Sequence, residues 1–349
     1  MNLKRMWAMF RARNKEFFRD KAAFGWNFLF PFLIVGGFAI VFGNSNYREY
    51  KIGVFPVAGG EISIEKLQIP EKFKLSSSFE FVGFENSEIA LDKLKHHKVD
   101  FLVRNHSANN EYWVNETSSK GYVIEQLFNA ALIPEGAEVK GTKKEIQGIE
   151  IRYIDWLFPG ILAMNMMFSA LFGVGYVIVR YRKNGVLKRL KATPLSAVEY
   201  LTSQMLSRNF LIMFTLVVVW VGCDLIFSFR TQGSYLNLLI VFFLGSLSLT
   251  ALGLIMAARG SSEEFVSGII NFITWPMMFL SEVWFSLEGA PEWIKLVSKL
   301  FPLTHLLTAA RRIMNDGVGL MEVRVELITL SVMSVAFLII GAAMFSWND

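Results

Sequence analysis

The chain has 349 residues, of which 53% are hydrophobic and only 19% are charged, and its formal net charge is +5. A soluble domain carries about a quarter charged residues, so this composition argues against a soluble globular protein. The lysines and arginines lie beside long apolar runs, which indicates membrane topology rather than nucleic-acid binding, and we expect no nucleic-acid partner. The single cysteine, Cys223, excludes an intrachain disulfide.

Residues 1–24 are predicted to form a cytoplasmic, interfacial amphipathic helix. Apolar side chains recur on one face at helical spacing, and basic side chains fill much of the rest. The aromatic residues that we expect to enter the lipid headgroup region are Trp7, Phe10, Phe17 and Phe18. An ordinary amphipathic helix that packs on a partner protein is the alternative interpretation of this pattern.

Residues 25–43 are apolar over roughly the 20 residues that a spanning helix needs, and they are predicted to form the first span. Seven lysines or arginines precede this run, which places the N-terminus in the cytoplasm by the positive-inside rule. We expect no cleavable signal peptide, because the run is as long as a full span and lacks a small-residue cleavage site.

Residues 44–155 differ in character, with frequent charges of both signs. They are predicted to form a small extracytoplasmic α/β domain, inserted between the first and second spans. Strands are predicted over 50–55, 79–84, 99–104 and 111–114, and helices over 87–98 and 117–132. Residues 134–148, rich in Gly, Lys and Glu, are predicted to be a linker.

Residues 156–349 are predicted to hold the remaining spans. The fold class is therefore an α-helical polytopic membrane protein with six transmembrane helices and one inserted α/β domain. The apolar runs that define spans two to six cover 156–180, 207–229, 235–258, 265–286 and 325–347. Residues 287–322 are predicted to form short helices at the outer face. An even number of spans returns the C-terminus to the cytoplasm, and an external domain without disulfides suits a bacterial inner membrane.

The segment 182–200, between the second and third spans, is short, basic and bounded by turn-forming residues. Turns are predicted at Gly185 and at the Thr193-Pro194 pair. A helix of roughly ten residues is too short to cross a membrane, but it can transmit force from a cytoplasmic partner to the two spans that it joins. A simple positive-inside anchor is the alternative interpretation.

Six spans, both termini inside and a large external domain after the first span resemble the permease subunits of type-2 ABC exporters, in the branch with a large external loop. The segment after the second span carries the more specific likeness. The positions that match the family's pattern there are Gly185, Leu187, Leu190, Thr193 and Pro194. Lys188 and Val186 depart from the pattern, since the family usually has Glu and Thr at these positions.

Two further stretches match the family. Arg19-Asp20-Lys21 followed by Phe30-Pro31 resembles its entry into the first span. The pattern before the last span is matched by Pro291-Glu292-Trp293-Ile294, Phe301-Pro302-Leu303-Thr304 and Ala310-Arg311. The likeness covers the whole membrane part of the chain.

The resemblance implies that residues 182–200 include a coupling helix that docks on a separate ABC ATPase subunit. The residues assigned to coupling are Arg182, Gly185, Leu187, Lys188, Arg189, Leu190, Thr193 and Pro194. A second permease, identical or related, is also implied, with ATP and Mg²⁺ bound by the partner ATPase. The chain has no G-x-x-x-x-G-K-[ST] motif, and we expect no cofactor, metal or catalytic residue in it. The implied function is export of a hydrophobic or amphipathic substrate.

Polar and methionine side chains within the predicted spans are candidates for lining a transport pathway. These are Asn165, Met167, Asn271, Thr274 and Met277. The alternative is that the polar groups form interhelical hydrogen bonds and the methionines only pack. Asp224 and Glu282 lie near predicted outer span ends, within reach of water, which disfavours a proton relay.

Two other classes of function stay open from the sequence. A membrane-anchored receptor or assembly protein would bind a partner through the external domain, although six spans exceed what an anchor needs. An ion-coupled secondary transporter is disfavoured, because neither central charges nor a clear internal repeat are found. His96, His97 and His106 in the external domain are expected to be solvated, because no metal-ligand pattern surrounds them.

Overall fold

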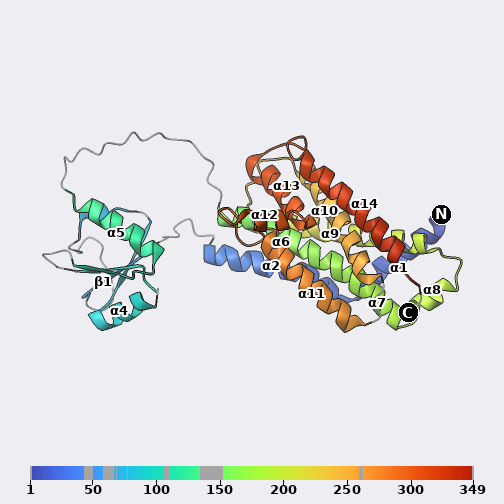
Figure 1. Ribbon diagram of the computed structural model, residues 1–349, viewed down its shortest axis with the longest axis horizontal. Coiled ribbons are helices and arrows are strands. Elements are labelled where there is room, and N and C mark those ends of the chain that lie inside the picture. Colours follow the sequence, from blue (N-terminus) through green and yellow to red (C-terminus); the bar gives the residue numbers. More distant parts are fainter. Residues whose placement is uncertain are drawn as a thin grey trace. The chain divides into compact units, whose positions relative to one another are not determined.

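The computed structural model of the chain describes residues 2–42, 50–57, 67, 69–76, 78–96, 98–105, 111–133, 152–258 and 262–347. The chain divides into two compact units. One comprises Met1–Gly43 with Glu150–Asp349, and the other Asn44–Ile149 (Figure 1). The predicted linker 134–148 lies outside the described residues.

The smaller unit is an α/β fold. Its elements are β1 (Tyr50–Phe55), α3 (Glu71–Lys74), β2 (Phe79–Gly83), α4 (Ser87–Lys95), β3 (Phe101–Arg104), β4 (Tyr112–Val114) and α5 (Ser119–Ala131). The predicted strands and the two predicted helices are confirmed, with ends that differ by up to three residues. The short helix α3 was not predicted, because four residues are too few to show a helical period.

The sheet has the strand order β2-β1-β3-β4. Strand β1 runs parallel to both β2 and β3, while β4 is antiparallel to β3. Alternate residues face opposite sides of a strand, so Val54 packs with Phe101 and Phe128 of α5, while the neighbouring Phe55 packs with Leu94 of α4. Helices therefore cover both faces of the sheet, as Figure 1 shows for α5 and α4.

The larger unit is helical in its described part. Its helices are α1 (Leu3–Arg19), α2 (Lys21–Phe42), α6 (Tyr153–Ala170), the π-helix η3 (Leu171–Tyr176), α7 (Val177–Lys183), α8 (Val186–Lys191), α9 (Ala197–Phe227), α10 (Tyr235–Ala257), α11 (Glu263–Leu280), α12 (Glu292–Ser298), α13 (Pro302–Asp316) and α14 (Arg324–Met344). Helix α14 runs beside α10 (Figure 1). Helices α12 and α13 are the two short helices within the predicted range 287–322.

Four helices among the described residues are long and apolar enough to cross a membrane. They are Tyr153–Lys183, Ala197–Phe227, Tyr235–Ala257 and Arg324–Met344. A fifth is reached when α1 and Phe24–Ile40 of α2, which meet at a bend of 62°, are counted as one broken span. These four or five helices make the chain a multi-pass membrane protein.

Three predicted spans differ from the observed helices. The first, 25–43, corresponds to α2, which is counted as a span only together with α1. Helix α9 begins at Ala197 rather than near residue 207, because Ser196 and Glu199 form a capping box that starts it earlier. The predicted fifth span, 265–286, corresponds to α11, which ends at Leu280 and is not among the candidate spans. Glu263 and Glu264 in its first turn, together with Asn271, make α11 less apolar than the other spanning helices.

Helix α10 and the π-helix η3 approach closely because glycines lie where their backbones meet. A Cβ on Gly253 would lie 3.2 Å from the carbonyl oxygen of Ala170, and one on Gly175 would lie 3.3 Å from the carbonyl oxygen of Gly253. Small residues allow helices in a membrane to pack backbone against backbone. This contact packs the candidate span Tyr153–Lys183 against α10.

Replacing Gly253 by leucine should therefore destabilise the bundle by about 1–3 kcal/mol, because the added side chain has no space at this contact. The expected result is a lower midpoint of thermal unfolding for the detergent-purified protein. Gly268→Leu on α11 is the matched control, since nothing lies within 4 Å of a Cβ at Gly268. Equal midpoints for the two variants would contradict the close contact.

Candidate functional site

Residues 184–196, which we term the connecting segment, link the candidate span Tyr153–Lys183 to α9. Gly185 adopts a left-handed conformation with φ of +66°, which ends α7 and starts α8. A Cβ there would meet nothing closer than 3.7 Å, so the requirement for glycine is one of backbone conformation and not of space. After α8, the Thr193 hydroxyl donates to the carbonyl of Leu190 at 2.6 Å and closes the turn before Pro194.

One face of α8 is fixed to the bundle and the other is exposed. The side chain of Leu187 is completely buried in the main core, whereas Lys188, Arg189 and Lys191 are exposed. The helix has six residues rather than roughly ten, because the left-handed Gly185 and the turn at Thr193 delimit it. The segment therefore presents a short basic surface on a fixed backbone.

Arg182, which the sequence assigned to the same exposed surface, is instead buried. Only 4% of it is exposed, and its guanidinium donates to the carbonyls of Ala257 at 3.1 Å, Ala258 at 3.2 Å and Ser346 at 3.0 Å. These carbonyls lie at the end of α10 and in the C-terminal segment, where helix-end acceptors need donors. Arg182 thus acts as an internal clamp, and neither it nor the buried Leu187 is available to a docking partner.

Helix α1 is attached to the connecting segment at its N-terminal end. The Glu199 carboxylate accepts hydrogen bonds from the backbone N–H of Ser196 at 3.0 Å and from that of Asn2 at 2.6 Å. The Arg5 guanidinium donates to the carbonyl of Pro194. Helix α1 is thereby tied both to the turn that follows α8 and to the first turn of α9.

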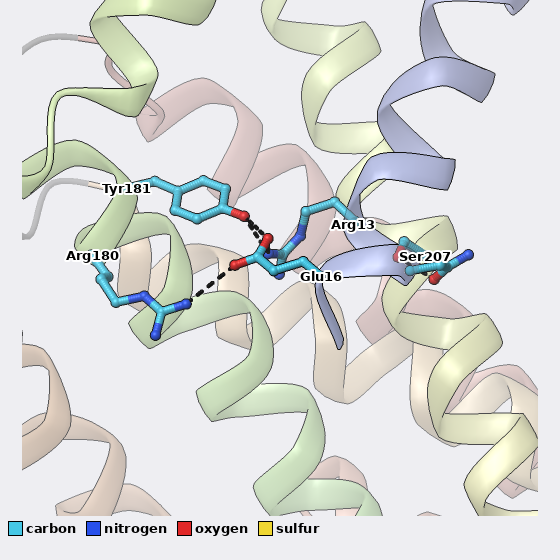
Figure 2. Close-up of polar contacts among 6 residues, drawn as sticks. Arg13, Glu16, Arg180, Tyr181 and Ser207 are labelled. Carbon is cyan, nitrogen blue, oxygen red and sulfur yellow. Dashed lines mark hydrogen bonds and ion pairs between the residues drawn. The ribbon is translucent and has the colours of Figure 1, made fainter. Parts of the chain in front are cut away.

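A second polar network joins the other end of α1 to the bundle (Figure 2). The Glu16 carboxylate is paired with Arg13 at 2.6 Å and with Arg180 at 3.3 Å, and it also accepts the hydroxyl of Tyr181. The Arg13 guanidinium donates to the Tyr181 hydroxyl and lies over the tyrosine ring. Glu16 therefore holds three groups from two different helices together.

The aromatic residues predicted to enter the membrane interface lie along the contact between α1 and α9. Trp7 stacks on Phe10 with ring centroids 5.0 Å apart, and Phe10 meets Phe210 of α9 edge to face. Phe18 meets Phe214 of α9 in the same way, and Phe17 contacts Phe18. Trp7 is 58% exposed and Phe18 45% exposed, so each keeps a free surface. The interfacial location stays a prediction.

The five candidate pathway residues do not converge on one cavity. Asn165 donates to the carbonyl of Asn27 at 3.4 Å, whereas Asn271 is exposed on α11 and donates to Ser267 within its own helix. Thr274, Met167 and Met277 are fully buried, with the two methionines in the main core. Within one chain these residues therefore line no common path.

Acidic side chains near predicted span ends have local structural partners. The Asp224 carboxylate accepts the backbone N–H of Phe229, and that of Glu282 accepts the N–H of Leu287 at 2.8 Å. Arg311 of α13 donates to the carbonyls of Glu282 and Trp156, and its guanidinium lies 3.7 Å from the centre of the Trp156 ring. Burial lowers the pKa of Arg311 to about 10, which leaves it charged at neutral pH.

Sequence reasoning missed Arg208. The predicted third span begins at residue 207, which leaves Arg208 at its edge, whereas in the structure α9 begins at Ala197 and Arg208 lies well inside it. Its guanidinium donates to the Ser169 hydroxyl of α6, and it lies directly against Gly173 in the π-helix. The signal that could have found it was its position as the last charged residue before an apolar run that continues to Asp224.

Within the described ranges, no group of three or more His, Cys, Asp or Glu side chains could hold a metal ion. His96 is exposed and lies beside Asp92 of the same helix. His97 and His106 lie outside the described residues.

The helical bundle with its spanning helices and connecting segment defines a polytopic α-helical membrane protein. The chain belongs to the ABC-2 family of transporter proteins, whose family model matches residues 21–343. This match extends over both units and includes the connecting segment, but it begins after α1.

Individual relatives are more distant. The chain is 25% identical to the daunorubicin resistance ABC transporter permease protein DrrB1 of Streptomyces coeruleorubidus over 178 residues, which is 49% of this chain and 61% of that protein. It is 22% identical to the inner membrane transport permease YhhJ of Escherichia coli over 194 residues, 54% of this chain and 51% of that protein. The chain is 25% identical to ABC transporter G family member 20 of Dictyostelium discoideum over 202 residues, which is 57% of this chain and 27% of that protein. The chain therefore spans about half to three fifths of the two permeases.

Arg182 and Arg189 lie in one short stretch and should behave oppositely on substitution. Arg182→Gln should lower the stability by about 3 kcal/mol, because it removes charge-assisted hydrogen bonds to three carbonyls. Arg189→Gln should leave the thermal unfolding midpoint unchanged, because the side chain is exposed. The measurement is thermal unfolding in detergent, and equal midpoints for both variants would refute the buried clamp.

Proposed function

We propose that the chain is the membrane-spanning permease subunit of an ATP-driven ABC exporter. Separate ABC ATPase subunits bind ATP and Mg²⁺ and dock on the exposed side of the connecting segment. A second permease, identical or related, completes the transporter. Membership of the ABC-2 family supports this proposal, and so does the likeness to two proteins whose names call them permeases.

The observation that carries the proposal is the construction of the connecting segment. Leu187 and the clamp of Arg182 fix its inner side, and the hydrogen bonds of Glu199 fix its end to α1. A segment that served only as a charge anchor would need basic residues but not three independent attachments. Because the connecting segment is attached in this way, a partner that displaces Arg189 would also displace α7, α9 and α1.

For the topology, we propose six spans with both termini in the cytoplasm of a bacterial cell and the smaller unit outside the inner membrane. The spans are α2, α6 continued through α7, α9, α10, α11 and α14. Helix α1 and the connecting segment are both rich in lysine and arginine, which supports a common cytoplasmic location. This arrangement also places α12 and α13 at the outer face.

The substrate pathway is proposed to form between two permeases. Exposed Asn271 on α11 becomes part of such a path only when a second subunit faces it. The proposed substrate is hydrophobic or amphipathic, since the described spans offer few polar side chains to a hydrophilic one. A relative named for daunorubicin resistance is compatible with this class.

Arg189→Glu tests the docking surface without disturbing the fold. Reversing an exposed charge at the interface should weaken association with the ATPase roughly ten-fold, because attraction becomes repulsion. The measurement is ATP hydrolysis, and the amount of ATPase retained, in complexes purified from native membranes through a tag on this chain. Gly185→Pro should have the same effect, because proline cannot adopt a φ of +66°.

Arg230→Glu provides the control, since Arg230 is exposed beyond the opposite end of α9. It should retain the parent amount of ATPase. The proposal fails if Arg189→Glu and Arg230→Glu retain the ATPase equally and hydrolyse ATP at the parent rate.

A further inference from the structure

A cavity of about 230 Å³ lies where α1, α2, the candidate span Tyr153–Lys183 and α9 meet. Its polar lining combines three guanidinium groups with two carboxylates and one amide. These are Arg13, Arg180 and Arg208, Glu16 and Asp20, and Asn27. The remaining wall is largely apolar and includes Phe17, Phe172 and Leu211. Such a cavity suits a ligand that carries both an anionic group and an apolar part.

Arg208 is the cation in this cavity that lacks a countercharge. Among the described residues, its guanidinium forms one hydrogen bond, to the hydroxyl of Ser169, and takes part in no ion pair. The buried Nε of Arg208 has no partner there, and neither has the buried Nε of Arg13. A charge removed from water without an opposite charge is costly, so an anion that entered the cavity beside the Arg208 guanidinium would be bound favourably.

Glu16 does not supply that countercharge. Its carboxylate is already shared by Arg13, Arg180 and the hydroxyl of Tyr181 (Figure 2). Arg180 and Glu16 are each 40% exposed in their side chains, so the cavity has a polar rim that a ligand can enter. Arg208 lies deeper, against Gly173.

The charged residues around this cavity lie at the ends of apolar runs in three helices. Arg208 is the last charged residue before the apolar run that extends to Asp224 in α9, and Arg180 closes an uncharged run that begins at Trp156. Lys21 precedes the apolar part of α2. Charged residues at the ends of three apolar spans lie at the level of lipid headgroups, and basic pockets between spans are suited to anionic headgroups.

We propose that this cavity binds the phosphate group of an anionic phospholipid. The phosphate accepts from the guanidinium groups of Arg13 and Arg208 that line the cavity, and the guanidinium geometry suits a phosphate better than a single point charge would. The acyl chains lie against the apolar wall that includes Phe17 and Leu211. The bound lipid neutralises Arg208 and links α1 to α9.

Gly173 is part of this site because it makes room for the arginine. A Cβ at Gly173 would lie 2.0 Å from Cζ of Arg208, so any side chain there must displace the guanidinium. Gly173→Ala therefore moves the charge without removing it. This variant separates the position of the guanidinium from the net charge of the protein.

The test is native mass spectrometry of the detergent-purified chain with phosphatidylglycerol, with phosphatidylcholine and with inorganic phosphate. The parent protein should bind phosphatidylglycerol at least ten-fold more tightly than phosphatidylcholine. Arg208→Gln and Gly173→Ala should each reduce this preference about ten-fold, whereas Arg230→Gln, an exposed arginine beyond the far end of α9, should retain it. Inorganic phosphate should not displace the lipid, because it lacks acyl chains.

Equal binding of the two lipids by the parent protein would overturn the proposal, and this outcome needs no variant. Unchanged preference in Gly173→Ala, or loss of preference in Arg230→Gln, would also overturn it. Displacement by inorganic phosphate would assign the cavity to a free phosphate ion and overturn the lipid assignment. The measurement contains no ATPase, so its failure leaves the proposed transport function untouched.

Discussion

The position of the connecting segment on the helical bundle depends on the guanidinium of Arg182. It donates to three backbone carbonyls, two at the end of α10 and one in the C-terminal segment. In a membrane protein, helix-end acceptors without water need an internal donor. By satisfying them, Arg182 fixes the end of α7, and Gly185 and α8 then start from a defined position. The basic surface of α8 is therefore exposed on a rigid support.

Helix α1 extends this support along the bundle. Glu199 of α9 accepts the N–H of Asn2 at the start of α1, and Glu16 near the end of α1 pairs with Arg180 of α7. Helix α1 is therefore attached at both ends through a carboxylate. Between them, Ser203 and Ser207 of α9 form hydrogen bonds to Met6 and Asn14 of α1. These contacts attach α1 to α9 along its length, so in the proposed function a displacement of the connecting segment would move α1 as well. The lipid proposed at Arg208 lies between the same helices.

Local patterns in the sequence predicted the strands of the smaller unit and the turns at Gly185 and Thr193, because alternation and turn chemistry depend on near neighbours. Contacts between distant segments could not be predicted in this way. The three carbonyl partners of Arg182 lie 75, 76 and 164 positions away, and a basic residue in a basic loop is expected to be exposed. Arg208 was missed for a related reason, since only the packing of α6 against α9 shows what surrounds it. Of the predicted spans, α11 is not among the candidate spans, and α2 is counted only together with α1.

The most direct test of the account is lysine-specific cross-linking in native membranes, followed by mass spectrometry of the tagged chain. The account predicts cross-links from Lys188 or Lys191 on the connecting segment to a separate protein that carries a phosphate-binding G-x-x-x-x-G-K-[ST] motif. Lys295 and Lys299, which the proposed topology places outside, should form none to that protein. Cross-links to such an ATPase from Lys295 or Lys299 alone, or the absence of any ATPase partner, would contradict the account.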